Sequence, residues 1–245
     1  MDPAEYEHLY KLEDNLWWFV AMRRIVDSLL HAHLPKTSGL DILDAGCGTG
    51  GSLRQLQRYG RVTAFDFYPK AAQLSNGRSN GRIAVASIDA IPYEDASFDL
   101  VTSLDVICQL EPESEQQAIR ELVRVLKPGG TLIVRCPALQ ILYGSHDETL
   151  QTRHRYTASE MAKKLRSAGL RPVRTTYANT LLLPIAFARR MLARLTRKRP
   201  GESDVRPVPA PLNLALETLL SLEAPLLKRA SLPIGLSVIA VAKKP

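Results

Sequence analysis

Hydrophobic and polar positions along the chain follow two repeats, one typical of helices and one typical of strands. In residues 2–34, leucines and other apolar side chains recur at helical spacing until residues 35–39 break the pattern. After that break, short apolar runs alternate with helical segments. The pattern predicts strands at residues 41–45, 61–66, 83–87, 98–104, 131–136, 170–178 and 236–242, and helices at residues 50–59, 69–76, 113–126, 157–168, 181–199 and 212–230.

The order of these elements predicts the fold class. Strands that alternate with helices form a largely parallel α/β sheet covered on both faces, with a ligand crevice beyond the carboxyl ends of the strands. We therefore expect a Rossmann-like, doubly wound sheet. The expected organisation is an N-terminal helical lid at residues 1–38, the core at residues 39–178, a basic helical insertion at residues 179–231 and a closing strand at residues 232–245.

The positive charge is confined to the end of the chain. The formal net charge is +7, and residues 1–180 hold 21 Lys and Arg against 21 Asp and Glu, whereas residues 181–245 hold 11 against 4. The arginine-rich segment 189–199 follows an apolar run at residues 181–187, which suits an anionic membrane surface and equally a cover over a substrate pocket. Nucleic acid is disfavoured because the basic segment has no interleaved aromatic residues.

Cysteine usage and apolar run lengths indicate the compartment. Cys47, Cys108 and Cys136 are odd in number and form no C-x-x-C pair, so we expect neither disulfides nor a metal site. The acidic, aromatic N-terminus argues against a signal peptide. The uncharged run at residues 175–188 is shorter than the ~20 residues of a spanning helix. A cytoplasmic protein is expected, with peripheral membrane contact as an option.

A glycine-rich turn follows the first predicted strand, in Asp44-Ala45-Gly46-Cys47-Gly48-Thr49-Gly50-Gly51. Gly46, Gly48 and Gly51 also have the G-x-G-x-x-G spacing of dinucleotide-binding folds, with Asp66 twenty residues after Gly46. A carboxylate at Asp44 would repel a pyrophosphate but suits a ligand that carries an ammonium and a sulfonium. The sequence therefore favours S-adenosylmethionine as the cofactor, with a nicotinamide-dependent oxidoreductase as the weaker alternative.

Five segments together resemble the class I S-adenosylmethionine-dependent methyltransferases of the bacterial small-molecule type. They are residues 44–50, Asp66, residues 88–93, residues 97–101 and residues 126–130, and the resemblance covers about residues 39–178. It implies a seven-stranded sheet whose last strand is antiparallel. It also implies an enzyme that transfers a methyl group to a small acceptor.

The resemblance also implies a role for each matched residue. Asp44 would hold the methionine end of the cofactor, Asp66 the ribose hydroxyls and Asp89 the adenine amino group. The alternative is that these aspartates only cap helices and turns. The expected cofactor-binding residues are Asp44, Gly46, Cys47, Gly48, Gly50, Asp66, Phe67, Ile88, Asp89, Ala90 and Leu104.

His154 is the first candidate for a general base, because relatives often have a histidine beside the acceptor at this point of the chain. The equal alternative is a histidine that caps the following helix or bonds to the backbone. Tyr156 is a weaker catalytic candidate. Cys108-Gln109 stands where many relatives carry a Glu-His pair, so Gln109 is expected to contact the acceptor, as is His146.

Trp17-Trp18-Phe19, followed by Arg23 and Arg24, resembles an N-terminal signature of some bacterial methyltransferases. Three large rings in a row cannot all face one core on a helix. We expect Trp17 and Trp18 to cover the acceptor, the alternative being an anchor of the N-terminal helix to the sheet. The predicted acceptor is small and hydrophobic or lipid-linked. A non-catalytic, cofactor-binding partner subunit is the alternative function.

Overall fold

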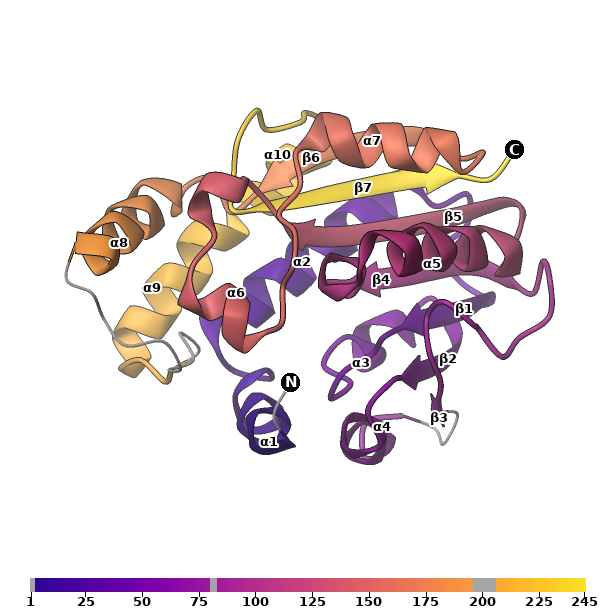
Figure 1. Cartoon of the computed structure of the whole chain (residues 1–245), viewed down its shortest axis with the longest axis horizontal. Helices are drawn as coiled ribbons and strands as arrows, with labels where there is room; N and C mark the ends of the chain where they lie inside the picture. The colour runs from indigo at the N-terminus through magenta and orange to yellow at the C-terminus, as the bar shows by residue number, and fades with distance from the viewer. Residues whose placement is uncertain (1–2, 80–82, 196–205) are drawn as a thin grey trace.

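A computed structural model describes residues 3–79, 83–195 and 206–245. Its seven strands form one sheet in the order β3-β2-β1-β4-β5-β7-β6, and β7 runs antiparallel to both neighbours (Figure 1). This confirms the predicted fold class. The strands are β1 (Leu40–Ala45), β2 (Gly60–Asp66), β3 (Ile83–Val85), β4 (Phe98–Leu104), β5 (Leu126–Pro137), β6 (Arg171–Ala178) and β7 (Ser237–Lys243).

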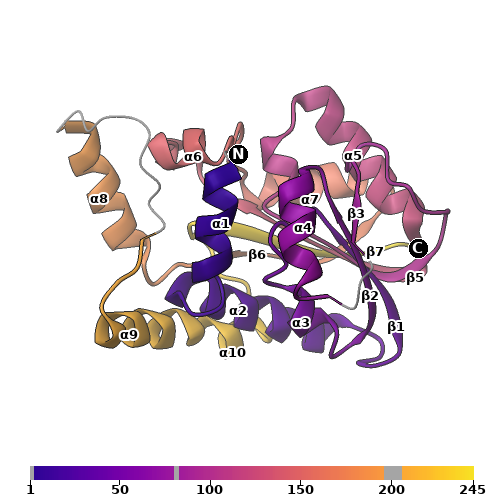
Figure 2. The same cartoon turned by 90° about the horizontal axis from the view of Figure 1, so that it is seen from below.

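Helices cover both faces of the sheet, and Figure 2 shows the two layers edge-on. Near the N-terminus lie α1 (Pro3–Leu12) and α2 (Trp17–His33). The helices between the strands are α3 (Leu53–Leu56), α4 (Pro69–Asn76), the 3₁₀ turn η1 (Ile107–Gln109), α5 (Pro112–Val125), the 3₁₀ turn η2 (Gln140–Leu142), α6 (Ser145–Thr149) and α7 (Ala158–Ser167). Before β7 come α8 (Leu183–Leu195), α9 (Ala210–Ser221) and α10 (Glu223–Leu227).

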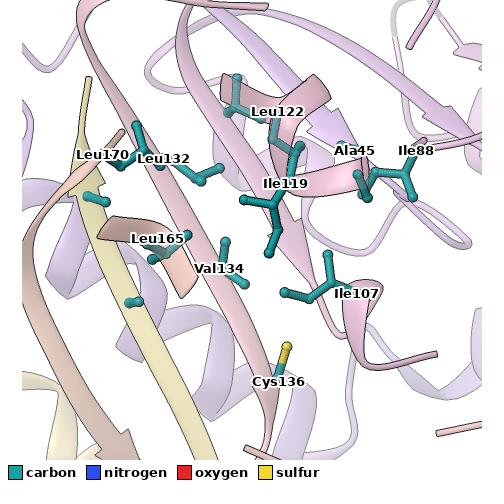
Figure 3. Close-up of a cluster of buried hydrophobic side chains, with 14 of the residues drawn as sticks. Ala45, Ile88, Ile107, Ile119, Leu122, Leu132, Val134, Cys136, Leu165 and Leu170 are labelled. Atoms are coloured by element: carbon teal, nitrogen blue, oxygen red, sulfur yellow. The ribbon is translucent and has the colours of Figure 1, made fainter. Parts of the chain in front are cut away.

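One face of the sheet is sealed by α5 and α7. Leu132 and Val134 of β5 lie between Ile119 of α5 and Leu165 of α7, and all four are buried (Figure 3). Burying side chains of this size stabilises a fold by roughly 1.5–3 kcal/mol each. These contacts fix α5 and α7 against the central strands of the sheet.

The other face is sealed by α2, with α9 and α10 beside it. Met22, Ile25 and Leu29 of α2 are fully buried and share one cluster with Ile42 of β1 and Leu100 of β4. Helix α2 is therefore a layer of the core.

Several predicted boundaries differ from the structure for identifiable reasons. The helix expected at residues 113–126 ends at Val125, because Leu126 is extended and Pro128 disfavours helix just before it. The helix expected at residues 212–230 is divided at Leu222, where Pro225 cannot donate a hydrogen bond back along the helix. The helix expected at residues 50–59 is only Leu53–Leu56. Residues 196–199 of the predicted basic helix lie outside the described residues.

Candidate active site

Asp44 lies near the end of β1, at the carboxyl edge of the sheet. It is level with Ala64 of β2 and Thr102 of β4. The Thr102 hydroxyl donates to Asp44 Oδ1 at 2.6 Å. Burial raises the pKa of Asp44 from 3.8 to about 6, the Thr102 hydrogen bond opposes this, and the charge of Asp66 raises it further. Asp44 is thus a buried acid with a fixed orientation.

The glycine loop after β1 is built for close approach to a ligand. Gly46, Gly48 and Gly50 have φ values of +81°, +56° and +87°, which side chains disfavour. A Cβ on Gly46 would collide with Val106 at 2.4 Å, whereas a Cβ on Gly48 would meet nothing within 4 Å. The exposed side of Gly48 therefore leaves open space next to the backbone.

Asp66 ends β2 on the other side of this loop. Its carboxylate accepts hydrogen bonds from the N–H groups of Gly48 at 2.8 Å and Tyr68 at 3.0 Å. Burial raises the pKa of Asp66, and these N–H groups oppose the increase. Each oxygen keeps a further acceptor site, so Asp66 can still receive two hydroxyl groups.

Tyr6 of α1 covers the same corner and is not among the predicted site residues. Its ring lies 5.6 Å from the ring of Tyr68, centre to centre. Burial and the nearby Asp66 raise the pKa of the Tyr6 phenol well above its ordinary value. The helical pattern of residues 2–34 indicated α1 but gave no signal that α1 reaches the end of β2.

A buried ion pair holds the start of the chain against the glycine loop. Arg78 pairs with Glu13, and Glu13 also accepts from the hydroxyl of Thr49 in the loop. Arg78 further bonds Asp14 at 2.9 Å and lies 4.0 Å above the ring centre of Tyr10. This cluster could not be predicted from the sequence, because Glu13 and Arg78 are 65 residues apart and their spacing matches no motif.

The predicted adenine-side residues are unevenly placed. Phe67 is 62% exposed beside Tyr68, and Asp89 is half-buried and accepts from the hydroxyl of Ser87. Ile88 is buried in the core cluster and Ala90 is exposed. Cys47 is buried, and burial raises the pKa of its thiol.

The first turn of α2 lies over the ends of β4 and β5. Arg135 of β5 pairs with Asp105 at 2.6 Å and lies 5.1 Å from the ring centre of Trp18. The N–H of Trp17 donates to Asn213 of α9 at 2.9 Å. Both tryptophans are half-buried and pack against the cluster under α2, which shows the anchoring contact directly.

The loop at the end of β4 is shaped by Asp105, which has a φ of +62°. Leu104, just before it, is half-buried against the cluster under α2. The Gln109 side chain donates to the backbone oxygen of Asp105 at 2.8 Å, so this amide helps to close the turn. Non-glycine residues at such φ values are strained and are found often at functional sites.

His154 is 43% exposed and its Nε2 lies 2.8 Å from a carboxylate oxygen of Glu160. Glu160 also completes the start of α7, where its N–H donates to the hydroxyl of Thr157, as the capping pattern predicts. His154 therefore has a carboxylate partner that orients its ring, in addition to contacting the cap of α7.

Tyr156 does not suit the expected catalytic role. It is fully buried within the cluster under α5 and α7, and burial raises the pKa of its phenol far above the ordinary value. A hydroxyl inside the core cannot touch a substrate, so this candidate is corrected to a structural residue. His146 lies in α6 and is half-buried.

The chemistry of the site follows from its charges. Asp44 and Asp66 are both buried carboxylates, and the charge of Asp66 raises the pKa of Asp44. Arg135 is the cation whose charge lowers the pKa of Asp44. A ligand with its own positive charge and hydroxyl groups would complete this arrangement, whereas a pyrophosphate would add to the repulsion.

Residues 43–134 match the family model described as a methyltransferase domain. The chain is 39% identical over 112 residues to a malonyl-[acyl-carrier protein] O-methyltransferase of Enterobacter lignolyticus, covering 45% of this chain and 43% of that one. It is 37% identical over 106 residues to a demethylmenaquinone methyltransferase of Tropheryma whipplei, covering 41% and 43%. The chain thus spans less than half the length of these curated relatives.

The fold is similar to a solved structure from Thermotoga maritima described as a possible histamine N-methyltransferase. The TM-score is 0.61 at 18% identity, over 99% of this chain and 96% of that one. The sheet order and the glycine loop define a Rossmann-like α/β fold. The matched residues 43–134 run from β1 to β5, so the centre of this sheet carries the similarity to the methyltransferase domain.

The free protein should become more stable when Asp44 is replaced by Asn. Because folding raises the pKa of Asp44 to about 6, the ionised form is costly in the native state at pH 7. Asp44→Asn should raise the unfolding free energy by about 1–3 kcal/mol at pH 7.5. Below pH 6 the wild-type carboxyl is neutral in the folded protein, so this gain should shrink toward zero near pH 4.

Urea unfolding of both proteins at pH 4.5 and pH 7.5 measures this difference. Comparing variant with wild type at each pH removes the titration of all other groups. A variant that is less stable at pH 7.5, or equally stabilised at both pH values, would contradict the assignment of a strained buried charge.

Proposed function

We propose that this protein binds S-adenosylmethionine at the carboxyl edge of its sheet and transfers the methyl group to a small acceptor that is hydrophobic or lipid-linked. The observation that carries the proposal is the pair of buried carboxylates, Asp44 and Asp66, on either side of a glycine loop in a methyltransferase domain. A sulfonium and an ammonium would bring positive charge to this pair, whose burial disfavours ionisation.

The residues of the site fit the parts of this cofactor. Asp44 would hold the methionine ammonium, Asp66 the ribose hydroxyls and Asp89 the adenine amino group. The backbone of Gly46, Gly48 and Gly50, next to Cys47, would lie along the nucleoside. Phe67, Ile88 and Ala90 would border the base, and Leu104 the methionine chain.

The bound cofactor supplies an electrophilic methyl group, so the protein mainly has to align the acceptor with it. Trp17, Trp18, Gln109 and His146 are the acceptor-side candidates around the ends of β4 and β5. Trp17 and Trp18 offer apolar surface. By their descriptions, the relatives named above act on malonyl-[acyl-carrier protein] and on demethylmenaquinone. The second, a lipid quinone, supports an acceptor that is hydrophobic or lipid-linked.

His154 is the residue we assign as general base where the acceptor needs deprotonation. The Glu160 carboxylate at 2.8 Å orients the imidazole, as carboxylates do beside catalytic histidines. The half-exposed position of His154 allows contact with a substrate, in contrast with the buried Tyr156.

A non-catalytic, cofactor-binding subunit is the second candidate. It is favoured by Gln109, whose amide is engaged with the backbone of Asp105 in place of a catalytic side chain. Turnover separates the two, since both predict binding of the cofactor. A nicotinamide-dependent oxidoreductase is disfavoured by Asp44 and by the family match.

Peripheral contact with an anionic membrane belongs to the same proposal, because a lipid-linked acceptor would be collected there. Within the described residues, the helices are too short or too polar for any of them to cross a bilayer. A contact of this kind would therefore involve the surface of the protein, with the cofactor site remaining in water.

Binding of S-adenosylmethionine tests the proposal directly. We expect isothermal calorimetry to show one site for the cofactor and for S-adenosylhomocysteine. Asp66→Asn should weaken both by about tenfold or more, because the ribose hydroxyls lose a charged acceptor. Asp95→Asn, a matched change at an exposed aspartate paired with Arg124, should bind like wild type. A folded protein that binds neither ligand would refute the proposal.

The role of His154 is separable from its contact with the start of α7. With a phenolic or quinol acceptor that supports turnover, His154→Gln should lower kcat by about 10²-fold or more. The KM for S-adenosylmethionine should stay the same, because His154 is assigned to the acceptor side. If His154 only caps α7, kcat would be unchanged and the unfolding free energy would fall by about 1 kcal/mol.

A further inference from the structure

The exposed apolar surface of this protein is gathered in one part of the chain. Within the described residues, ten of the thirteen large apolar side chains that are exposed lie between residues 181 and 234. Scattered apolar residues are normal on a surface, whereas a concentration of this kind marks a contact site. Figures 1 and 2 show α8 and α9 at the end of the molecule opposite the C-terminus.

The unit α9–α10 is apolar on two sides. Leu216, Leu220 and Leu227 pack against the cluster under α2, and we call this the packed side of α9–α10. The two helices are divided at Leu222, but Leu222 itself has helical φ and ψ, so the helical spacing of side chains continues from α9 into α10. A second set recurs at helical spacing and is exposed, and we call it the outer stripe: Leu212, Leu219, Leu222 and Leu226.

The outer stripe lies to one side of the packed leucines. At 100° per residue its centre is about 95° around the helix from the centre of the packed side. Leu222 is 54% exposed and Leu226 is 53% exposed, so most of each side chain contacts solvent. Helix α8 repeats the pattern with exposed Ile185 and Leu192, seven residues apart.

The charges around the outer stripe are positive. The two acids of residues 206–234 are both engaged: Glu217 pairs with Arg24 at 2.8 Å, and Glu223 is buried and accepts three backbone N–H groups. Lys228 and Arg229 follow α10 on the exposed surface. In α8, Arg190 pairs with Asp147 of α6 at 3.1 Å, so the exposed cations beside the outer stripe are Lys228 and Arg229.

We propose that the outer stripe of α9–α10, with the exposed face of α8, docks onto an anionic lipid surface. Leucines at helical spacing with cations beside them match the apolar boundary and the negative headgroups of such a surface. A second copy of the chain would bring the same positive charges together, which opposes pairing through this surface.

The location of the stripe connects it with the acceptor site. The packed side of α9 contacts α2, and Asn213 of α9 bonds the N–H of Trp17 and, at 3.0 Å, the backbone oxygen of Asn15. Helix α9 therefore carries the outer stripe and also contacts the start of α2, where the tryptophans lie. This step rests on the proposed function, since it assigns the acceptor to the lipid phase.

Vesicle sedimentation with the full chain tests the docking surface. The probe is vesicles of phosphatidylcholine with and without phosphatidylglycerol. We expect binding to the anionic vesicles that weakens as salt rises. Leu222→Gln combined with Leu226→Gln should lower the partition coefficient by about tenfold or more. Lys228→Ala with Arg229→Ala should lower it on anionic vesicles only.

Leu214→Gln is the matched control. Leu214 is 64% exposed on the same helix but lies off the outer stripe, so its loss should change vesicle binding by less than about twofold. Thermal melting confirms that each variant is folded. The proposal is overturned if the wild-type protein does not bind anionic vesicles, or if the stripe variants bind them as the wild type does. It is also overturned if the wild type forms a dimer, the stripe variants are monomers, and neither binds vesicles.

Calorimetry with S-adenosylmethionine on the same samples separates this inference from the proposed function. Cofactor binding without vesicle binding would remove the docking surface and leave the enzyme proposal intact. Vesicle binding without cofactor binding would do the reverse. The stripe variants should bind the cofactor as wild type does, because none of their changes is at the carboxyl edge of the sheet.

Discussion

Two carboxylates at neighbouring strand ends are the constraint on which the site depends. Asp44 and Asp66 are both buried at the carboxyl edge, and burial disfavours the charge on each. The free protein tolerates this arrangement because Thr102 bonds one carboxylate and two backbone N–H groups bond the other. Two buried carboxylates side by side favour a cationic ligand, and this links the fold to the chemistry proposed for it.

The surrounding elements keep this edge in shape. The buried pair of Glu13 and Arg78 connects the end of α1 with Thr49 in the glycine loop, so the N-terminal segment and the loop are mechanically joined. Losing one partner of a buried pair costs several kcal/mol because the other charge is left alone. On the opposite side, Asp105 and Arg135 hold the turn after β4 beneath Trp18. Charged contacts thus stabilise both the glycine loop and the turn after β4, on the two sides of the proposed site.

The fold could be predicted from the sequence because it rests on local signals. Strand and helix periodicities, Gly-Gly at residues 129–130 and the capping residues Thr157 and Glu160 all act over a few positions. Contacts between distant residues could not be predicted. Nothing near Arg78 indicates Glu13, and nothing near Asn213 indicates Trp17. Tyr156 misled for the same reason, since its neighbours in sequence are polar and only the packing of α5 and α7 buries it.

A crystal structure of the protein with S-adenosylhomocysteine tests the central claim most directly. We predict the ribose hydroxyls on Asp66, the amino group of the homocysteine moiety on the Asp44 side, and the sulfur facing the space below Trp17 and Trp18. A ligand bound elsewhere on the molecule, or bound with its ribose turned away from Asp66, would contradict the account.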